Sequence, residues 1–265
     1  MKRTPRREGI PQLSALVAIA ALSLLGRANA QEFQYSGDDG PAHWSELSSE
    51  WGACAGPEGT ARQSPINLGK VSIDKRLRRL KLQTYPTTID IFNNGHTIEQ
   101  HYEGTGSSIH FEGIDYELQQ FHFHTLSEHT IGGEHGVMEF HAVFSSGNAN
   151  LVVGMLFHIG WYFNPFIQKL INAGLPEREG DTTETDDAID LADALTDTQS
   201  YYTYGGSLTT PPCSETVTWV VLTKPARLHH RQFESFRRIL GNNFRPLQPL
   251  NGREVRISRP PHGHW

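Results

Sequence analysis

Residues 120–124 have the sequence Gln-Phe-His-Phe-His, a strict alternation of polar and aromatic side chains. On a β-strand, side chains two residues apart share a face, so His122 and His124 should project together while both phenylalanines enter a core behind them. Residues 138–143 alternate in the same way and place His141 on one face of a second strand. If the two strands are neighbours, three imidazoles meet at one point of a sheet.

Three neutral imidazole nitrogens with one open coordination position suit a catalytic zinc ion, whereas a structural zinc would need a fourth protein ligand and none presents itself. Gln120 and Glu139 lie two residues before a histidine on the same strand face, so each can accept the second ring N–H of a ligand. A His-x-His strand can also be a packed or half-exposed pair. The second strand and its polar neighbours favour one zinc ion held by His122, His124 and His141.

The rest of the chain also indicates short strands separated by turn residues such as Asn93-Asn94-Gly95 and Gly205-Gly206. Strand character is seen in residues 88–92, 117–124, 137–144, 151–159 and 216–222. Two of these runs are almost continuously apolar, as in strands covered on both faces. Helices are expected only at residues 165–171 and 231–240, and the acidic residues 177–193 are expected to form a solvated surface loop. These patterns predict one mainly β domain with small peripheral helices.

The first thirty residues are typical of an export signal. A basic start is followed by the apolar run 13–25 and by Ala28-Asn29-Ala30, a small-x-small cleavage pattern. The apolar run is too short to cross a bilayer core of roughly 30 Å as a helix, so we expect no stable membrane anchor after cleavage. An uncleaved N-terminal anchor is the alternative. We therefore predict an exported domain at residues 31–265, in a bacterial periplasm by preference or in the outside medium.

Removing residues 1–30 changes the number of Lys and Arg from 23 to 18 and of Asp and Glu from 29 to 28. The exported chain is then acidic and has no basic stripe to neutralise phosphates, which argues against nucleic acid as a partner. Cys54 and Cys213 are the only cysteines. In an oxidising compartment such a pair most simply forms a disulfide, with free buried thiols as the alternative.

Several motifs together resemble the alpha-class carbonic anhydrases, and the likeness extends from about residue 33 to residue 257. They are residues 63–66, 93–96, 120–124, 127–130, 139–141 and 201–212. The resemblance implies a wide, mostly antiparallel twisted sheet and reversible hydration of carbon dioxide to bicarbonate and a proton by a zinc-bound hydroxide. It also implies one zinc ion per chain, carbon dioxide and bicarbonate as small-molecule partners, and the homodimer common among exported bacterial relatives.

The resemblance further implies roles for residues outside the histidine strands. Thr209 would orient the hydroxide and donate its own proton to Glu128, because an ionised carboxylate can only accept. His96 would act as the proton shuttle, since an imidazole with a pKa of about 6.5 takes up and releases protons near neutral pH. Cys54 and Cys213 would match the disulfide of exported members.

Other residues would line the site by the same resemblance. The carbon dioxide pocket would be formed by Val143, Val152, Leu208, Trp219 and Thr210. The waters of the proton path would be ordered by Tyr35, Asn94 and Gln120. His129 matches a buried structural histidine bonded to Tyr204.

Three rival interpretations remain at this stage. A catalytically inactive binding domain should lack one of the key residues, yet the three histidines, Glu128 and Thr209 are all present. Another kind of hydrolase is disfavoured because the chain has no Gly-x-Ser-x-Gly and no His-Glu-x-x-His motif. A zinc-storage protein would bind more than one zinc per chain.

Overall fold

The computed structural model describes residues 32–57, 59–195 and 197–258, so the predicted export signal lies outside the described residues. The helical segments are η1 (Gly37–Asp39), α1 (Trp44–Leu47), η2 (Ser49–Cys54), α2 (Pro165–Ala173), α3 (Leu191–Ala194) and α4 (His230–Leu240). The strands are β1 (Asn67–Leu68), β2 (Ser72–Ile73), β3 (Lys81–Gln83), β4 (Thr87–Asn93), β5 (Ile98–His101), β6 (Ser108–Phe111), β7 (Ile114–His124), β8 (Thr130–Ile131), β9 (Glu134–His135), β10 (Met138–Ser146), β11 (Ala149–Gly160), β12 (Thr182–Ile189), β13 (Tyr201–Gly206), β14 (Val217–Leu222), β15 (Ala226–His229) and β16 (Arg256–Ile257).

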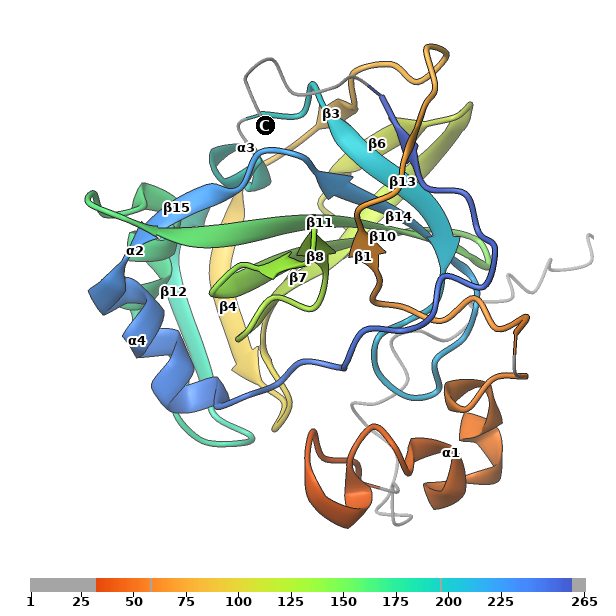
Figure 1. Cartoon of the computed structure of the whole chain (residues 1–265). Helices are drawn as coiled ribbons and strands as arrows, with labels where there is room; N and C mark the ends of the chain where they lie inside the picture. The colour runs from red at the N-terminus through yellow and green to blue at the C-terminus, as the bar shows by residue number, and fades with distance from the viewer. Residues whose placement is uncertain (1–31, 58, 196, 259–265) are drawn as a thin grey trace, which may run out of the picture. The chain divides into compact units, whose positions relative to one another are not determined.

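Within the described part of the chain, one sheet of 13 strands dominates the fold (Figure 1). Its main path runs β12-β4-β5-β7-β10-β11-β14-β13-β16-β2, and β1, β8 and β9 form a separate small sheet. Most neighbours are antiparallel, while β11 pairs in parallel with β14 and β15, and β16 with β2. The fold is therefore mainly β with a large, mostly antiparallel sheet, as predicted.

Strand β11 is buried on both faces, as its continuous apolar run predicts. Val153 and Met155 join the main hydrophobic core on one face of the sheet. Val152 and Leu156 join a second apolar cluster on the other face, together with Trp219 of β14. The centre of the sheet therefore lies between two cores, which leaves little freedom for this strand to shift.

Strands β7 and β10 pack their phenylalanines on one face and carry the histidines on the other. Phe121 of β7 packs against Phe140 of β10 with ring centroids 5.1 Å apart, and against Phe166 of α2 at 5.4 Å. The ring centroid of Phe123 lies 5.5 Å from that of Phe140. Such aromatic pairs contribute about 0.5–1.5 kcal/mol each beyond the area they bury. Packing on this side directs the alternate residues, the histidines, to the opposite face.

Helices α2 and α4 lie where the sequence predicts helices. The side chain of Asn164 accepts a hydrogen bond from the Ile167 amide at 3.1 Å, and Pro165 occupies the first helical position. At α4, the side chain of His229 accepts from the Arg231 amide at 3.2 Å. Both starts follow the ordinary chemistry of helix caps, in which a side chain satisfies an amide without an intrahelical partner.

The acidic segment at residues 177–193 corrects the sequence prediction. Instead of a solvated loop it contains the whole of β12, which pairs antiparallel with β4, and the start of α3. Ile189 and Leu191 are fully buried and anchor this segment to the main core. Its acidic side chains lie mostly on the exposed positions of an edge strand, where charge discourages pairing with other chains. The density of acidic residues concealed the strand pattern.

Cys54 and Cys213 form a disulfide that joins positions 159 residues apart. Both cysteines pack with Trp44 in a small cluster between the N-terminal helices and the segment after β13. Cys213 follows Pro211 and Pro212 directly, so the bridge holds the same segment that carries Thr209.

We expect the double substitution C54S/C213S to lower the free energy of unfolding by about 2–5 kcal/mol, because it releases a long loop in the unfolded chain. Urea unfolding followed by circular dichroism would measure the change. Wild-type protein reduced under native conditions serves as the matched control and should show a similar loss. Equal midpoints for the variant and the oxidised wild type would contradict this expectation.

Candidate metal centre

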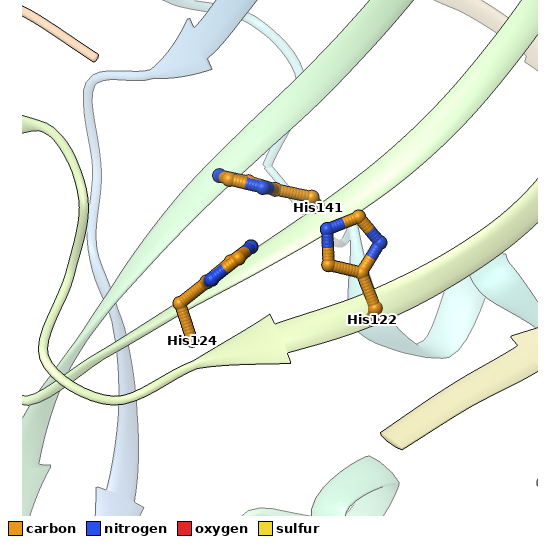
Figure 2. A group of neighbouring side chains, drawn as sticks. All are labelled: His122, His124 and His141. Atoms are coloured by element: carbon orange, nitrogen blue, oxygen red, sulfur yellow. The ribbon is translucent and has the colours of Figure 1, made fainter. Parts of the chain in front are cut away.

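The antiparallel pairing of β7 with β10 brings three histidines together on one face of the sheet. His141 lies directly opposite His122 in the strand register, and His124 lies opposite Glu139. The three rings have centroids 4.6–5.2 Å apart, and one nitrogen of each lies within 4.8 Å of the others. Figure 2 shows His122 and His124 rising from the same strand toward the ring of His141.

Two of these rings are oriented by oxygen atoms on their outer sides. Nδ1 of His122 lies 2.8 Å from Oε1 of Gln120, and Nδ1 of His124 lies 2.7 Å from the backbone oxygen of Asn243. A backbone oxygen can only accept, so Nδ1 of His124 must carry the proton, and the amide oxygen of Gln120 requires the same of His122. Each ring therefore presents an unprotonated Nε2 to the centre of the group.

The third ring is turned the other way. Nε2 of His141 donates to Oε1 of Glu139 at 3.0 Å, which leaves Nδ1 of His141 free. The same carboxylate accepts from the backbone amide and from Nδ1 of His129, both at 2.8 Å. Burial acts to raise the pKa of Glu139, but the electrostatic effect of the neighbouring His129 and His141 rings and their hydrogen bonds outweigh it and hold this pKa well below its ordinary value. Glu139 is thus a buried carboxylate that orients two imidazoles at once.

His129, Glu139 and His141 are also close enough to one another to suggest a second metal-binding group. Their facing atoms are already joined by hydrogen bonds, and Nε2 of His129 lies 2.6 Å from the hydroxyl of Tyr204. This contact with Tyr204 is the one predicted for a structural histidine. The hydrogen-bonded group offers no free set of lone pairs, so the His122, His124 and His141 group is the better metal site.

The surroundings keep two of the three rings in their neutral form. Burial and the neighbouring rings of His124 and His141 lower the pKa of His122 well below its ordinary value of 6.5. Burial likewise lowers the pKa of His124. Nε2 of His124 is buried without a hydrogen-bond partner among the described residues. A buried lone pair with no donor, beside the facing nitrogens of two other imidazoles, fits a metal ion that takes neutral imidazole nitrogens.

Glu128 is fully buried beside this group. Its Oε1 accepts from the backbone amide of Arg245 at 2.8 Å, and its Oε2 lies 3.7 Å from Nε2 of His124 and 4.0 Å from Nδ1 of His141. The expected hydrogen bond from Thr209 to Glu128 is not formed in this structure, because Oε2 of Glu128 has no hydrogen-bond partner among the described residues. The carboxylate instead directs this free oxygen toward the ring nitrogens.

An apolar wall borders the histidine group. Its cross-strand neighbours are Val143 of β10, Val152 of β11 and Trp219 of β14, which lie opposite one another in register. The Trp219 ring is 4.9 Å from the ring of His141, and its Nε1 donates to the Ser207 backbone oxygen at 3.0 Å. Leu208 packs on the same cluster. Thr210 is half-buried, and its backbone oxygen accepts from the Cys213 amide at 2.9 Å.

His96 lies on the turn between β4 and β5. Its ring stacks on Phe33 with centroids 3.9 Å apart, and Tyr35 approaches edge-on at 6.5 Å. Oδ1 of Asn94 accepts from the amides of His96 and Thr97 at 3.0 and 2.8 Å, so this side chain shapes the turn itself. Burial lowers the pKa of His96 from 6.5, against an opposing effect of nearby acidic groups. Burial, with a contribution from Glu128, raises the pKa of Tyr35 well above 10.0, so its phenol stays protonated.

Asn243 was not identified from the sequence. Besides the bond to His124, its Nδ2 donates to the backbone oxygens of His96 and Phe123 at 2.9 and 3.0 Å. Its Oδ1 accepts from the Thr125 amide at 2.7 Å. One side chain therefore joins the His96 turn to the end of β7, from a position 119 residues away in the chain. No local motif around residue 243 signals this role.

Comparisons with known proteins point to one family. The sequence model of the family described as eukaryotic-type carbonic anhydrase matches residues 39–259. The carbonic anhydrase of Neisseria gonorrhoeae is 36% identical, over 96% of this chain and 99% of that protein. The alpha-carbonic anhydrase structure from Photobacterium profundum is 35% identical with a TM-score of 0.78, over 85% of this chain and 100% of that one. The alpha-carbonic anhydrase structure from Thermovibrio ammonificans, in complex with the inhibitor sulfanilamide, is 37% identical with a TM-score of 0.79. This match covers 85% of this chain and 99% of that one.

We expect the metal-free protein to lose stability as the pH falls below 6.5, the ordinary pKa of a histidine. The unfolded chain takes up protons on His122 and His124 near this pH, whereas the folded chain resists protonation because both pKa values are lowered. Stability is therefore full above 6.5 and is lost as the pH falls toward the lowered folded values.

Urea unfolding above and below this pH would test the expectation. The variant H122N/H124N should show a shallower pH dependence, while substitution of the exposed His110 by asparagine should leave it unchanged. The same pH dependence of the unfolding free energy in the wild type and in H122N/H124N would contradict the attribution of this effect to these two histidines.

Proposed function

The chain belongs to the eukaryotic-type, or alpha-class, carbonic anhydrase family, and from this we propose that it hydrates carbon dioxide reversibly at one zinc ion held by His122, His124 and His141. The convergence of three unprotonated ring nitrogens carries the proposal, since each ring is fixed by an acceptor on its outer side. Family membership makes the chain a carbonic anhydrase. The metal, its ligands and the proton path are our assignments.

A zinc ion at this site would supply Lewis-acid chemistry that lowers the pKa of a water molecule toward neutrality, for which carbonic anhydrases are themselves the standard example. The protein's part is to present three neutral nitrogens in fixed orientation. Gln120, Glu139 and the backbone of Asn243 do this by holding the outer ring protons. Acceptors of this kind set the tautomer and make the ligand nitrogen more basic.

We assign Glu128 and Thr209 to orienting the reacting water. The Arg245 amide fixes one carboxylate oxygen of Glu128 and leaves the other free beside the histidines. A carboxylate only accepts, so a donating Thr209 hydroxyl would turn its lone pairs toward the water. That bond is not formed in this structure, so Thr209 or Glu128 would have to move to make it.

The apolar wall is assigned to carbon dioxide. A small molecule without hydrogen-bond donors is best received by side chains that leave no polar group unpaired, and Val143, Val152, Leu208 and Trp219 meet this need. Thr210 provides a polar boundary next to Thr209.

His96 is assigned to carrying the released proton to solvent. Its ring is half-buried between Phe33 and Tyr35, and its lowered pKa favours release of a proton once taken up. Tyr35, the Asn94 amide group and Gln120 are the polar groups we assign to ordering waters between His96 and the metal. No protein atom of the described residues hydrogen-bonds the buried Nδ1 of His96, which leaves this nitrogen to such a water.

We further propose that residues 1–30 are an export signal and that residues 31–265 form the enzyme, with the periplasm as its compartment. The disulfide supports an oxidising environment. No helix among the described residues is long and apolar enough to span a membrane. The homodimer remains a prediction from the family.

Stopped-flow carbon dioxide hydration by residues 31–265 loaded with zinc would test the function. We expect fast hydration and one zinc per chain. The loss of hydration activity in H122A should exceed the roughly 10–100-fold loss caused by removing an outer hydrogen-bond partner of a ligand. Zinc binding and an intact fold without hydration above buffer would mean a metal-binding domain without catalysis, and several zinc ions per chain would indicate storage.

For the proton path, we expect H96A to lower hydration in dilute buffer by roughly 10- to 100-fold, because a positioned group that transfers protons contributes on this order. Added imidazole should restore the rate by taking over the transfer. The substitution H110A at an exposed histidine is the matched control and should have no effect. A normal rate for H96A in dilute buffer would show that another group carries the proton.

A further inference from the structure

The loop between β11 and α2 carries three consecutive aromatic residues that face solvent. Trp161, Tyr162 and Phe163 are 92%, 85% and 49% exposed, and we call them the aromatic tip. Ile159, just before them, is 38% exposed. Single exposed apolar residues are ordinary, but a contiguous group of large ones marks an interaction site. This loop projects at the left of Figure 1.

The aromatic tip stands on a well-defined base. Gly160 pairs with His229 of β15, and the ring of Phe163 stacks on His229 with centroids 4.4 Å apart. The backbone of Asn164 is held on both sides by the side chain of Gln232, with bonds of 2.8 and 2.9 Å. Because these contacts order the loop in advance, binding through it costs less conformational entropy.

The aromatic tip lies far from the candidate metal centre. Gly154 of β11 is opposite His141, whereas the tip begins after Gly160 of the same strand. Six strand residues span about 20 Å at roughly 3.3 Å per residue. The catalytic proposal does not explain the tip, and hydration activity can report on folding when the tip is changed.

The charge around the aromatic tip differs from that of the whole chain. The chain carries 29 acidic residues and a net charge of −6, yet residues 140–176 and 216–233 contain none. Arg227 and Arg231 are exposed next to the tip, and neither forms a salt bridge within the described part of the chain. The guanidinium of Arg227 donates to the Ile159 backbone oxygen at 3.1 Å, which fixes this charge at the base of the tip.

Two nearby aspartates are already paired with lysines. Asp193 binds Lys169 at 2.9 Å, and Asp197 binds Lys224 at 3.3 Å. Glu234 of α4 lies 3.4 Å from His230. Arg227 and Arg231 are therefore cations beside the tip that no salt bridge compensates among the described residues.

We propose that the aromatic tip docks the protein on an anionic lipid surface. Trp and Tyr favour the membrane–water interface because one end of each side chain is apolar and the other is polar. Arginines beside them are attracted to anionic headgroups. A symmetric contact with a second copy centred on the tip would bring the arginines of both copies into one interface, so like charges disfavour it. One loop with two arginines supports reversible, salt-sensitive association rather than permanent anchoring.

Vesicle co-sedimentation with residues 31–265 tests the proposal. Residues 1–30 are left out because their apolar run would itself enter lipid, and every described element lies after them. We expect binding to phosphatidylcholine vesicles that contain phosphatidylglycerol, weaker binding to pure phosphatidylcholine, and release by salt. The variant W161S/Y162S should bind at least about tenfold more weakly, since burial of one large side chain already corresponds to such a factor. R231Q should also reduce binding to the anionic vesicles.

Two controls separate the tip from general effects. Y85S alters a residue that is 46% exposed elsewhere on the surface, and it should bind as the wild type does. Unchanged hydration activity in W161S/Y162S would show that this variant is folded. Brominated lipids should quench wild-type fluorescence, and W161F should bind but lose this quenching.

Three results would overturn the proposal: no binding of the wild type to anionic vesicles, undiminished binding of W161S/Y162S, or equal binding to both kinds of vesicle. A dimer that W161S/Y162S dissociates, without vesicle binding by the wild type, would assign the aromatic tip to a second copy instead.

Discussion

The antiparallel pairing of β7 with β10 determines where the candidate metal centre lies. In this register His141 faces His122, and a slip by one residue would turn the histidines into the core and the phenylalanines out of it. Phe121 and Phe140 oppose such a slip because they interlock with each other and with α2. Truncating one buried phenylalanine typically costs about 3–5 kcal/mol, so the apolar face specifies the geometry of the polar face.

Burial imposes a second constraint on the same site. Imidazole N–H groups removed from water need acceptors, and leaving one unpaired costs about 1–3 kcal/mol. The protein supplies an acceptor to each ring of the candidate metal centre, and Glu139 serves both His129 and His141. Replacing Glu139 would therefore disturb a ligand and a structural histidine together. Glu128 is held instead by a backbone amide, which leaves one oxygen free for work at the site.

The sequence was sufficient to predict the parts of the site that are local. Alternation identified the three histidines and their partners two residues away, and the apolar runs identified the central strands. Contacts made through the backbone of distant residues could not be predicted, because nearly every residue type has the backbone oxygen and amide that Asn243 and Arg245 contribute. The bond expected between Thr209 and Glu128 came from the family rather than from geometry, and this structure does not form it. The acidic strand β12 was misinterpreted because charge on an edge strand resembles a loop.

Strand β11 connects the two surfaces to which we assign functions. Its first half forms part of the wall beside the histidines through Val152, and its end supports the aromatic tip beyond Gly160. The strand is buried on both faces along most of its length, so it fixes the positions of both surfaces and has little room to shift. Substitutions at sites this far apart, without shared partners, usually have additive effects on the free energy of unfolding. The exposed end of the strand can therefore carry aromatic residues for docking without any change in the ligand geometry at its centre.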